Sequence, residues 1–217
     1  LYLTSESFAQ WQKQQSPLAQ GITKFGGQLY DIKVIDFAAA QGQPWSSDTL
    51  WDASYAEILY DPDQQLTALF RERLAQRPRV DEAQGLMMSC WWSFRLAGDI
   101  WIHRRDVVQG HHHFNQAIIA LTKALFVANQ EWIPHEKWLF HLSRSLAWTP
   151  DQWGERLQAA MSTGDFTIDS LRQRQEIIAA LWAELDSYLI ARYWPDLPVH
   201  MMQKSFYTLL RQLSEVG

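Results

Sequence analysis

One acidic residue lies where a catalytic carboxylate could lie, on a predicted strand. The segment Tyr30–Phe37 follows the turn signal Gly26-Gly27 and alternates between apolar residues and a set that includes Asp31, a pattern that predicts a half-buried strand. Phosphoryl or nucleotidyl transfer with two metal ions needs several carboxylates that converge on Mg²⁺, and Asp31 could be one of them. The alternative is a solvent-facing residue on an edge strand, and Asp31 taken alone favours this second interpretation.

An arginine and a histidine later in the chain have a spacing found in helical ribonucleases. Arg105 precedes His111 in the sequence by six positions. In such enzymes the histidine acts as acid or base and the arginine steadies the phosphate. Here Gly110 is expected to interrupt the helix between them, and the usual companion aromatic residue after the histidine is absent. Ribonuclease chemistry is therefore kept only as an alternative.

Three further features that could do chemistry have structural explanations that need no ligand or reaction. Consecutive helical residues point about 100° apart, so the side chains of His111-His112-His113 cannot all reach one metal ion. Asp61-Pro62-Asp63 stands at a predicted helix start, where capping accounts for the carboxylates. Cys90 has bulky apolar neighbours and no basic group beside it, which is the setting of an unreactive core thiol.

Composition restricts the class of protein. The chain has 217 residues, a formal net charge of −5, 47% hydrophobic residues and one cysteine, so it can bury a full core and cannot form an internal disulfide. We expect a cytoplasmic protein, because no apolar run approaches the roughly 18 residues of a membrane span and no signal peptide is present. The acidic balance gives no general electrostatic reason to bind nucleic acid.

The pattern of apolar residues changes after the first quarter of the chain. Residues 1–63 contain the two predicted strands, Tyr30–Phe37 and Ser54–Tyr60, and residues 64–217 read as a helical bundle. The sequence thus predicts an α+β fold that is mostly α, in two domains. The expected helices start near Pro62, Asp81 (ending at Gly110), His112, Pro150, Thr167 and His200.

Several segments, in this order, resemble the later part of a nucleotidyltransferase of the polymerase-β-like superfamily, in the style of the aminoglycoside and lincosamide enzymes. The similar segments are Gln28–Asp36, Ala56–Asp63, Arg104–Asp106, Ala124–Asn129 and Trp132–Leu139. The first is similar to the strand that carries the family's third carboxylate, and the last three to its helical bundle, of the type shared with HEPN domains. The resemblance covers about residues 25 to 150, and the order of the segments is its most specific feature.

The resemblance implies Mg²⁺-dependent transfer of a nucleoside monophosphate from an NTP to a small hydroxyl-bearing acceptor, in a cytoplasmic enzyme of bacterial type. Asp31 would be the third carboxylate, as metal ligand or as base. Lys137 and Lys123 would face the triphosphate, each with a solvated helix face as its alternative. Asn129 would bind nucleotide or acceptor, although an Asn at the end of a helix is equally a cap.

The family's defining motif, a Gly-Ser turn followed by Asp-x-Asp on a strand, is missing from the 217 residues. In the family it lies upstream of the third-carboxylate strand, and this sequence begins with Leu1, so we expect that an N-terminal portion is absent or that the chain is a degenerate member. The chain alone is then expected to be inactive. The other class of function left open is a noncatalytic HEPN-type helical partner of a toxin and antitoxin pair, or a dimerisation module, with a homodimer possible in either case.

Overall fold

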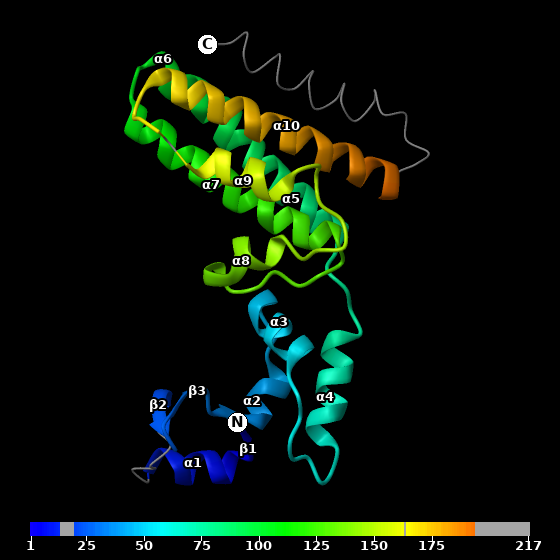
Figure 1. Cartoon of the computed structure of the whole chain (residues 1–217). Coiled ribbons are helices and arrows are strands. Elements are labelled where there is room, and N and C mark those ends of the chain that lie inside the picture. Colours follow the sequence, from blue (N-terminus) through cyan, green and yellow to red (C-terminus); the bar gives the residue numbers. More distant parts are fainter. Residues whose placement is uncertain (14–19, 163, 194–217) are drawn as a thin grey trace. The chain divides into compact units, whose positions relative to one another are not determined.

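The computed structural model describes residues 1–13, 20–162 and 164–193. The helix expected from His200 to Leu213 lies outside these described residues. The chain divides into two compact units, the first covering Leu1–Gln76 and the second starting at Arg77, whereas the sequence places the boundary between residues 63 and 64. In the described part helices predominate and strands are few and short (Figure 1), which confirms the mostly helical α+β fold.

The first unit combines short strands with short helices. Its two sheets have two strands each, one parallel and one an antiparallel hairpin. Gly26 and Gly27 make the hairpin turn with φ of 58° and 84°, values that glycine adopts without strain. In chain order the elements are β1 (Tyr2–Leu3), α1 (Ser5–Lys13), β2 (Gly21–Phe25), β3 (Gln28–Ile32), β4 (Ile35–Asp36), α2 (Phe37–Gly42), α3 (Ser47–Tyr55) and α4 (Gln65–Leu74).

The two strands expected from the sequence have different outcomes. Tyr30–Phe37 is divided: β3 ends at Ile32, β4 holds two residues, and α2 begins at Phe37. The strand expected at Ser54–Tyr60 is wrong, because Ser54 and Tyr55 end α3 and the following residues form no regular element. A strand needs a partner for its backbone groups, and the described part of the chain places none beside this segment.

The helix expected near Pro62 begins at Gln65, with Gln64 as its N-cap residue, and its first turn is bound by Asp61. Its carboxylate accepts hydrogen bonds from the backbone N–H groups of Leu66 (3.2 Å) and Thr67 (2.7 Å) and from the Thr67 hydroxyl (2.7 Å). These bonds lower the pKa of Asp61 below its usual value, with the Thr67 hydroxyl as the largest cause. Of the acidic pair Asp61 and Asp63, Asp61 is therefore explained by its hydrogen bonds to the start of α4.

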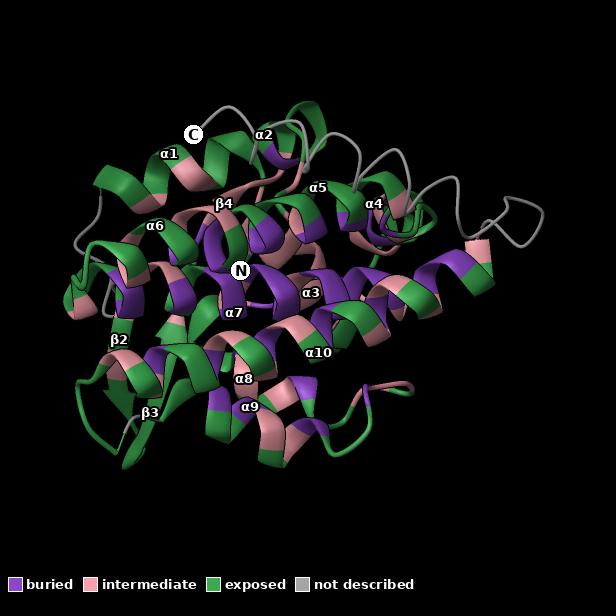
Figure 2. Cartoon of the chain, turned by 90° about the horizontal axis from the view of Figure 1, so that it is seen from above, coloured by how far each residue is buried: buried purple, intermediate pink, exposed green. Residues whose placement is uncertain are grey.

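The second unit is a helical bundle around one central helix. Its elements are α5 (Val80–Trp91), a π-helical turn η1 (Trp92–Ala97), α6 (Gly98–His103), α7 (Val107–Ala128), α8 (Glu136–Ser143), α9 (Trp153–Met161) and α10 (Ile168–Tyr193). Thirteen of the 22 residues of α7 are buried, and its ribbon is coloured as buried over most of its length (Figure 2). The other helices contact α7 from several sides, as the wide apolar surface of this segment predicts.

Gly110 does not end a helix. The chain instead turns at Arg104–Asp106, where Arg105 has a left-handed φ of 58° and the Asp106 carboxylate accepts a hydrogen bond from the backbone N–H of Gln109 at 3.0 Å. α7 thus begins three residues before Gly110 and runs through it. The glycine is needed for packing, because a Cβ at this position would lie 2.7 Å from a methyl carbon of Leu171 in α10.

We expect Gly110→Ala to lower the free energy of unfolding by about 1 to 3 kcal/mol, since the added methyl group overpacks a fully buried leucine. Gly85→Ala in α5 is the matched control, because a Cβ there meets nothing within 4 Å; it should raise stability by about 0.4 to 1 kcal/mol. Chemical denaturation of both variants measures the difference. Equal effects of the two substitutions would contradict the close approach of α7 and α10.

Candidate functional site

The carboxylate of Asp31 is exposed on a hairpin. Asp31 lies on β3 opposite Ile22 of β2, and the fold gives it no ion pair with another described residue. Within the ranges that the structure describes, no group of three or more His, Cys, Asp or Glu residues could hold a metal ion. Asp31 is thus free to bind a ligand, but this chain does not bring it together with other carboxylates.

The two lysines implied by the resemblance lie at or near the start of α8. The Lys123 ammonium on α7 lies 3.4 Å from a carboxylate oxygen of Glu136, the first residue of α8. Lys137 is the next residue and is exposed. One cation from α7 and one from α8, the next helix, therefore lie near the N-terminus of α8, which itself attracts anions. Glu136 offsets part of this charge.

Asn129 has the contacts of a cap. Its side-chain amide N–H₂ donates to the backbone carbonyls of Leu125 (2.8 Å) and Trp148 (2.9 Å), and its carbonyl oxygen accepts from the Trp148 N–H at 2.8 Å. Both polar atoms of the amide are thus occupied by the backbone, and the loop before α9 is tied to the end of α7. The structural interpretation accounts for Asn129 without a ligand.

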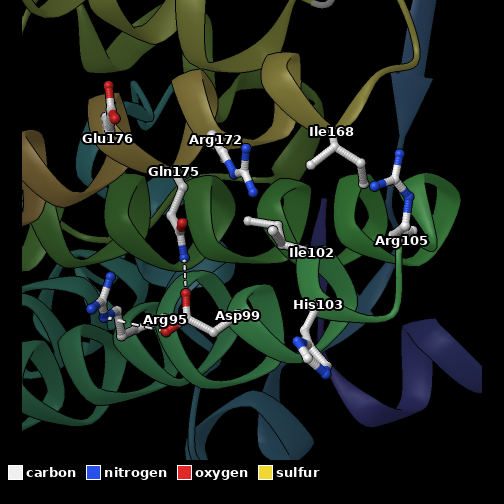
Figure 3. Close-up of a pocket in the computed structure, with 9 residues that line it drawn as sticks. All are labelled: Arg95, Asp99, Ile102, His103, Arg105, Ile168, Arg172, Gln175 and Glu176. Atoms are coloured by element: carbon white, nitrogen blue, oxygen red, sulfur yellow. Dashed lines mark hydrogen bonds and ion pairs between the residues drawn. The ribbon is translucent and has the colours of Figure 1, made fainter.

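A hollow in the second unit brings together arginines from separate elements (Figure 3). We call it the arginine hollow; its volume is about 550 Å³. It continues into a second hollow of about 500 Å³ that shares Arg105, Ile168 and Arg172 with it. Its lining residues are Arg95, Asp99, Ile102, His103, Arg105, Ile168, Arg172, Gln175 and Glu176.

The ion pairs around the arginine hollow leave one arginine unmatched. Arg95 lies 3.5 Å from the carboxylate of Asp99, which also accepts a hydrogen bond of 2.6 Å from Gln175. Arg172 lies 3.3 Å from Asp169. Arg105 makes no ion pair with a described residue, and its left-handed backbone is unusual for a residue other than glycine.

Behind this surface lies a buried arginine without a carboxylate partner among the described residues. The guanidinium of Arg174, 3% exposed, donates to the carbonyl of Ala160 at 2.5 Å and to the side-chain oxygen of Asn115 at 2.7 Å. It also contacts Nδ1 of His111. Burial lowers the pKa of Arg174 to about 10, but the group stays charged at neutral pH.

His111 is held as a neutral ring by this contact. Arginine has only donors, so Nδ1 must be the acceptor and Nε2 must carry the proton. Burial, and then the charge of Arg174, lower the pKa of His111 below 6.5. His111 is 6% exposed, its Nε2 has no described hydrogen-bond partner, and its ring meets the Phe166 ring edge to face at 4.8 Å.

Sequence reasoning found Arg105 and His111 but missed the arginines of α10. Arg174 could have been found, because Leu171, Arg174, Ile178, Leu181 and Leu185 follow one helical stripe and are all buried. Arg172 leaves no such signal, since an exposed arginine between Leu171 and Gln173 is typical of a solvated helix face. Arg105 and His111 both lie near the arginine hollow, but His111 is beneath the surface that Arg105 lines.

Comparison with protein-family models, with curated proteins and with solved structures finds no match to this chain. None of the described helices is both long enough and apolar enough to cross a membrane. The functional argument therefore depends on the geometry of the two units themselves.

His111 should make folding stability depend on pH. Its pKa is lower in the folded chain than the unfolded value of 6.5, so the unfolded chain binds more protons near and below that pH. Its contribution is complete above about pH 6.5 and is lost as pH falls toward the folded pKa. His111→Asn, which keeps an acceptor for Arg174, should flatten this dependence in unfolding curves measured from pH 7.5 to 4.5.

Asp186 must be separated from this effect. Burial raises its pKa from 3.8 to about 6, so its own contribution decreases stability as pH rises through that range. Because Asp186 is present in both proteins, the difference between wild type and His111→Asn isolates the histidine. If the difference in free energy of unfolding between wild type and His111→Asn does not change between pH 7.5 and 4.5, the pKa of His111 is not lowered by folding.

Proposed function

We propose that this chain is the C-terminal part of a Mg²⁺-dependent nucleotidyltransferase, consisting of the end of the catalytic α/β domain and a helical substrate-binding unit. The reaction is attack of an acceptor hydroxyl on the α-phosphorus of an NTP with pyrophosphate as leaving group. We place it in the cytoplasm. The acceptor is a small hydroxyl-bearing molecule, and Asp31, Lys123 and Lys137 are the residues of this chain that take part.

The observation that carries the proposal is the small size of the sheets in the first unit, each of which has two strands among the described residues. β1 and β4 form a parallel pair of two residues each, although parallel strands normally belong to larger sheets covered on both faces. The hairpin exposes Ile22 by 78%, Phe25 by 69% and Leu29 by 73%. A two-stranded hairpin with this much apolar surface is marginal alone, and the proposal explains it as the edge of a larger sheet.

The cations at the start of α8 support the binding of an NTP by the second unit. Lys123 and Lys137 approach this helix end from two helices, and a triphosphate can accept charged hydrogen bonds from both. The nearby Trp138 is 45% exposed and offers a ring face for a base. Asn129 supports this site by fixing the end of α7.

The implied Mg²⁺ is not accommodated by the described residues alone. Asp31 supplies one carboxylate, whereas two-metal transfer needs several, and the described part of the chain holds no metal-ligating group of three. On this proposal, the remaining carboxylates come from a Gly-Ser and Asp-x-Asp segment, which these 217 residues do not contain. Asp31 is then one ligand or the base that accepts the hydroxyl proton.

The alternatives stay hypotheses that the same assays separate. A ribonuclease would need His111 to reach its substrate, and here its Nδ1 contacts Arg174 while Phe166 packs against the ring. A noncatalytic helical partner or a dimerisation module would bind no NTP at α8. No contact among the described residues favours either alternative over the transferase.

Lys137→Ala should weaken ATP binding by roughly ten- to a hundredfold, the loss of one charged hydrogen bond of about 1.5 to 3 kcal/mol. The affinity is measured by titration calorimetry with the 217-residue chain. Lys13→Ala on α1 is the matched control, because that lysine is also exposed but lies in the other unit. Unchanged affinity of Lys137→Ala, or an equal loss in both variants, would make Lys137 a solvated surface residue.

The chain alone should transfer no nucleotide from labelled ATP to hydroxyl acceptors, since one carboxylate cannot hold the metal ions. In a protein that also contains the Gly-Ser and Asp-x-Asp segment, Asp31→Asn should abolish turnover and leave the melting temperature unchanged. Turnover and melting are measured on the same samples. Near wild-type turnover would return Asp31 to the role of a solvent-facing edge residue.

A further inference from the structure

We propose that the arginine hollow of the second unit, together with its continuation under Phe166, binds the dianionic phosphate group of a small phosphorylated ligand. Arg105 and Arg172 are its two principal ligands. This site is separate from the lysines at α8 and does not depend on the proposed transferase activity.

The first argument is unmatched positive charge. Of the arginines here, Arg105 and Arg174 have no carboxylate partner among the described residues. The acidic residues that line the two hollows are Asp99, Asp169 and Glu176. Asp99 is engaged by Arg95 and Gln175, and Asp169 by Arg172. Glu176 has no ion pair with a described residue, so the four arginines exceed the three carboxylates by one charge, and a phosphate group bound between Arg105 and Arg172 would offset that excess.

The second argument is the backbone of Arg105. Its φ of 58° is sparsely populated by residues with a side chain, and such conformations persist where the surrounding structure holds them, often at binding sites. Glycine would adopt this turn without steric strain. An arginine is therefore strained at this position, which is consistent with a guanidinium that serves a ligand.

The third argument is a buried donor that has no acceptor. Nε2–H of His111 is without a described hydrogen-bond partner, and a buried unpaired donor is costly. The His111 ring lies against Phe166, which lines the second hollow beside Arg105 and Arg172. An anion that displaces the Phe166 ring would meet this donor, with the charge of Arg174 behind it.

The size of the site suits a compact ligand. The two hollows of about 550 and 500 Å³ each lie within the range for small-molecule pockets. The first turn of α10, a helix of 26 residues, borders them through Thr167 and Ile168, and its dipole favours an anion at this end. One phosphate group with a short organic part fits these limits.

The test uses the whole chain in 0.15 M NaCl, titrated in parallel with inorganic phosphate, glycerol phosphate and glycerol. Wild type should bind both phosphates saturably and should not bind glycerol. Arg105→Gln and Arg172→Gln should each weaken phosphate binding at least about tenfold. The control is Arg79→Gln, an exposed arginine paired with Asp81 away from the hollow, which should bind as wild type does.

Arg105→Gly separates binding from folding. It should raise the melting temperature, because glycine relieves the left-handed turn, and it should lose phosphate affinity at the same time. Three results would overturn the proposal: no saturable phosphate binding by wild type, wild-type affinity in the double variant of Arg105 and Arg172, or an equal loss in Arg79→Gln. A loss in Lys123→Ala with none in the arginine variants would overturn it too, since it would place the phosphate at α8.

Discussion

The burial of α7 on nearly all sides is the constraint on which the second unit depends. A helix with this many buried residues cannot lie at a surface, so α5, α9 and α10 must pack around it. Close packing then requires glycine at two positions. Gly110 lets α10 approach α7. Gly98 leaves room for Phe114, whose ring carbon would lie 2.6 Å from a Cβ at position 98. The sites on the unit's surface are fixed by this core.

Arg174 is a charged side chain that is buried within the same packed unit. A buried guanidinium is tolerated only when its donors are satisfied, and here Ala160 at the end of α9 and two side chains of α7 satisfy them. The contacts join three helices at the end of the bundle where the arginine hollow lies. His111 is kept neutral by this arrangement, so its position has a structural cause whether or not a ligand is present.

Local signals in the sequence predicted the parts of the fold that local chemistry determines. Asp61 starts α4, and the Thr167 hydroxyl accepts from the N–H of Ser170 at 3.2 Å at the start of α10. The failures came from tertiary context. Gly110 is a helix breaker by type but is required by Leu171 of a distant helix. Ser54–Tyr60 was expected to be a strand and ends in the apolar run Ile58–Tyr60, yet no described strand pairs with it.

In the candidate site, too, some features have a local sequence signal and others depend on tertiary contacts. Lys137 lies in the first turn of α8, and Pro134 shortly before it is a local signal for that helix start. The contact of Lys123 with Glu136 joins two consecutive helices. Arg105 and Arg172, which line the same hollow, are far apart in the sequence. No local pattern predicts either arrangement. The sequence allowed Asn129 to be either a ligand-binding residue or a helix cap. Its hydrogen bonds to Trp148, which favour the cap, could not be predicted from the sequence.

The central claim is that the surface around the start of α8 binds a nucleoside triphosphate. Photo-crosslinking of the chain with an azido-ATP analogue, followed by mass-spectrometric mapping of the adducts, tests it most directly. The account predicts adducts within Lys123 and the segment Glu136–Ser143 that excess ATP removes. Adducts confined to other segments, or adducts that excess ATP leaves unchanged, would contradict it.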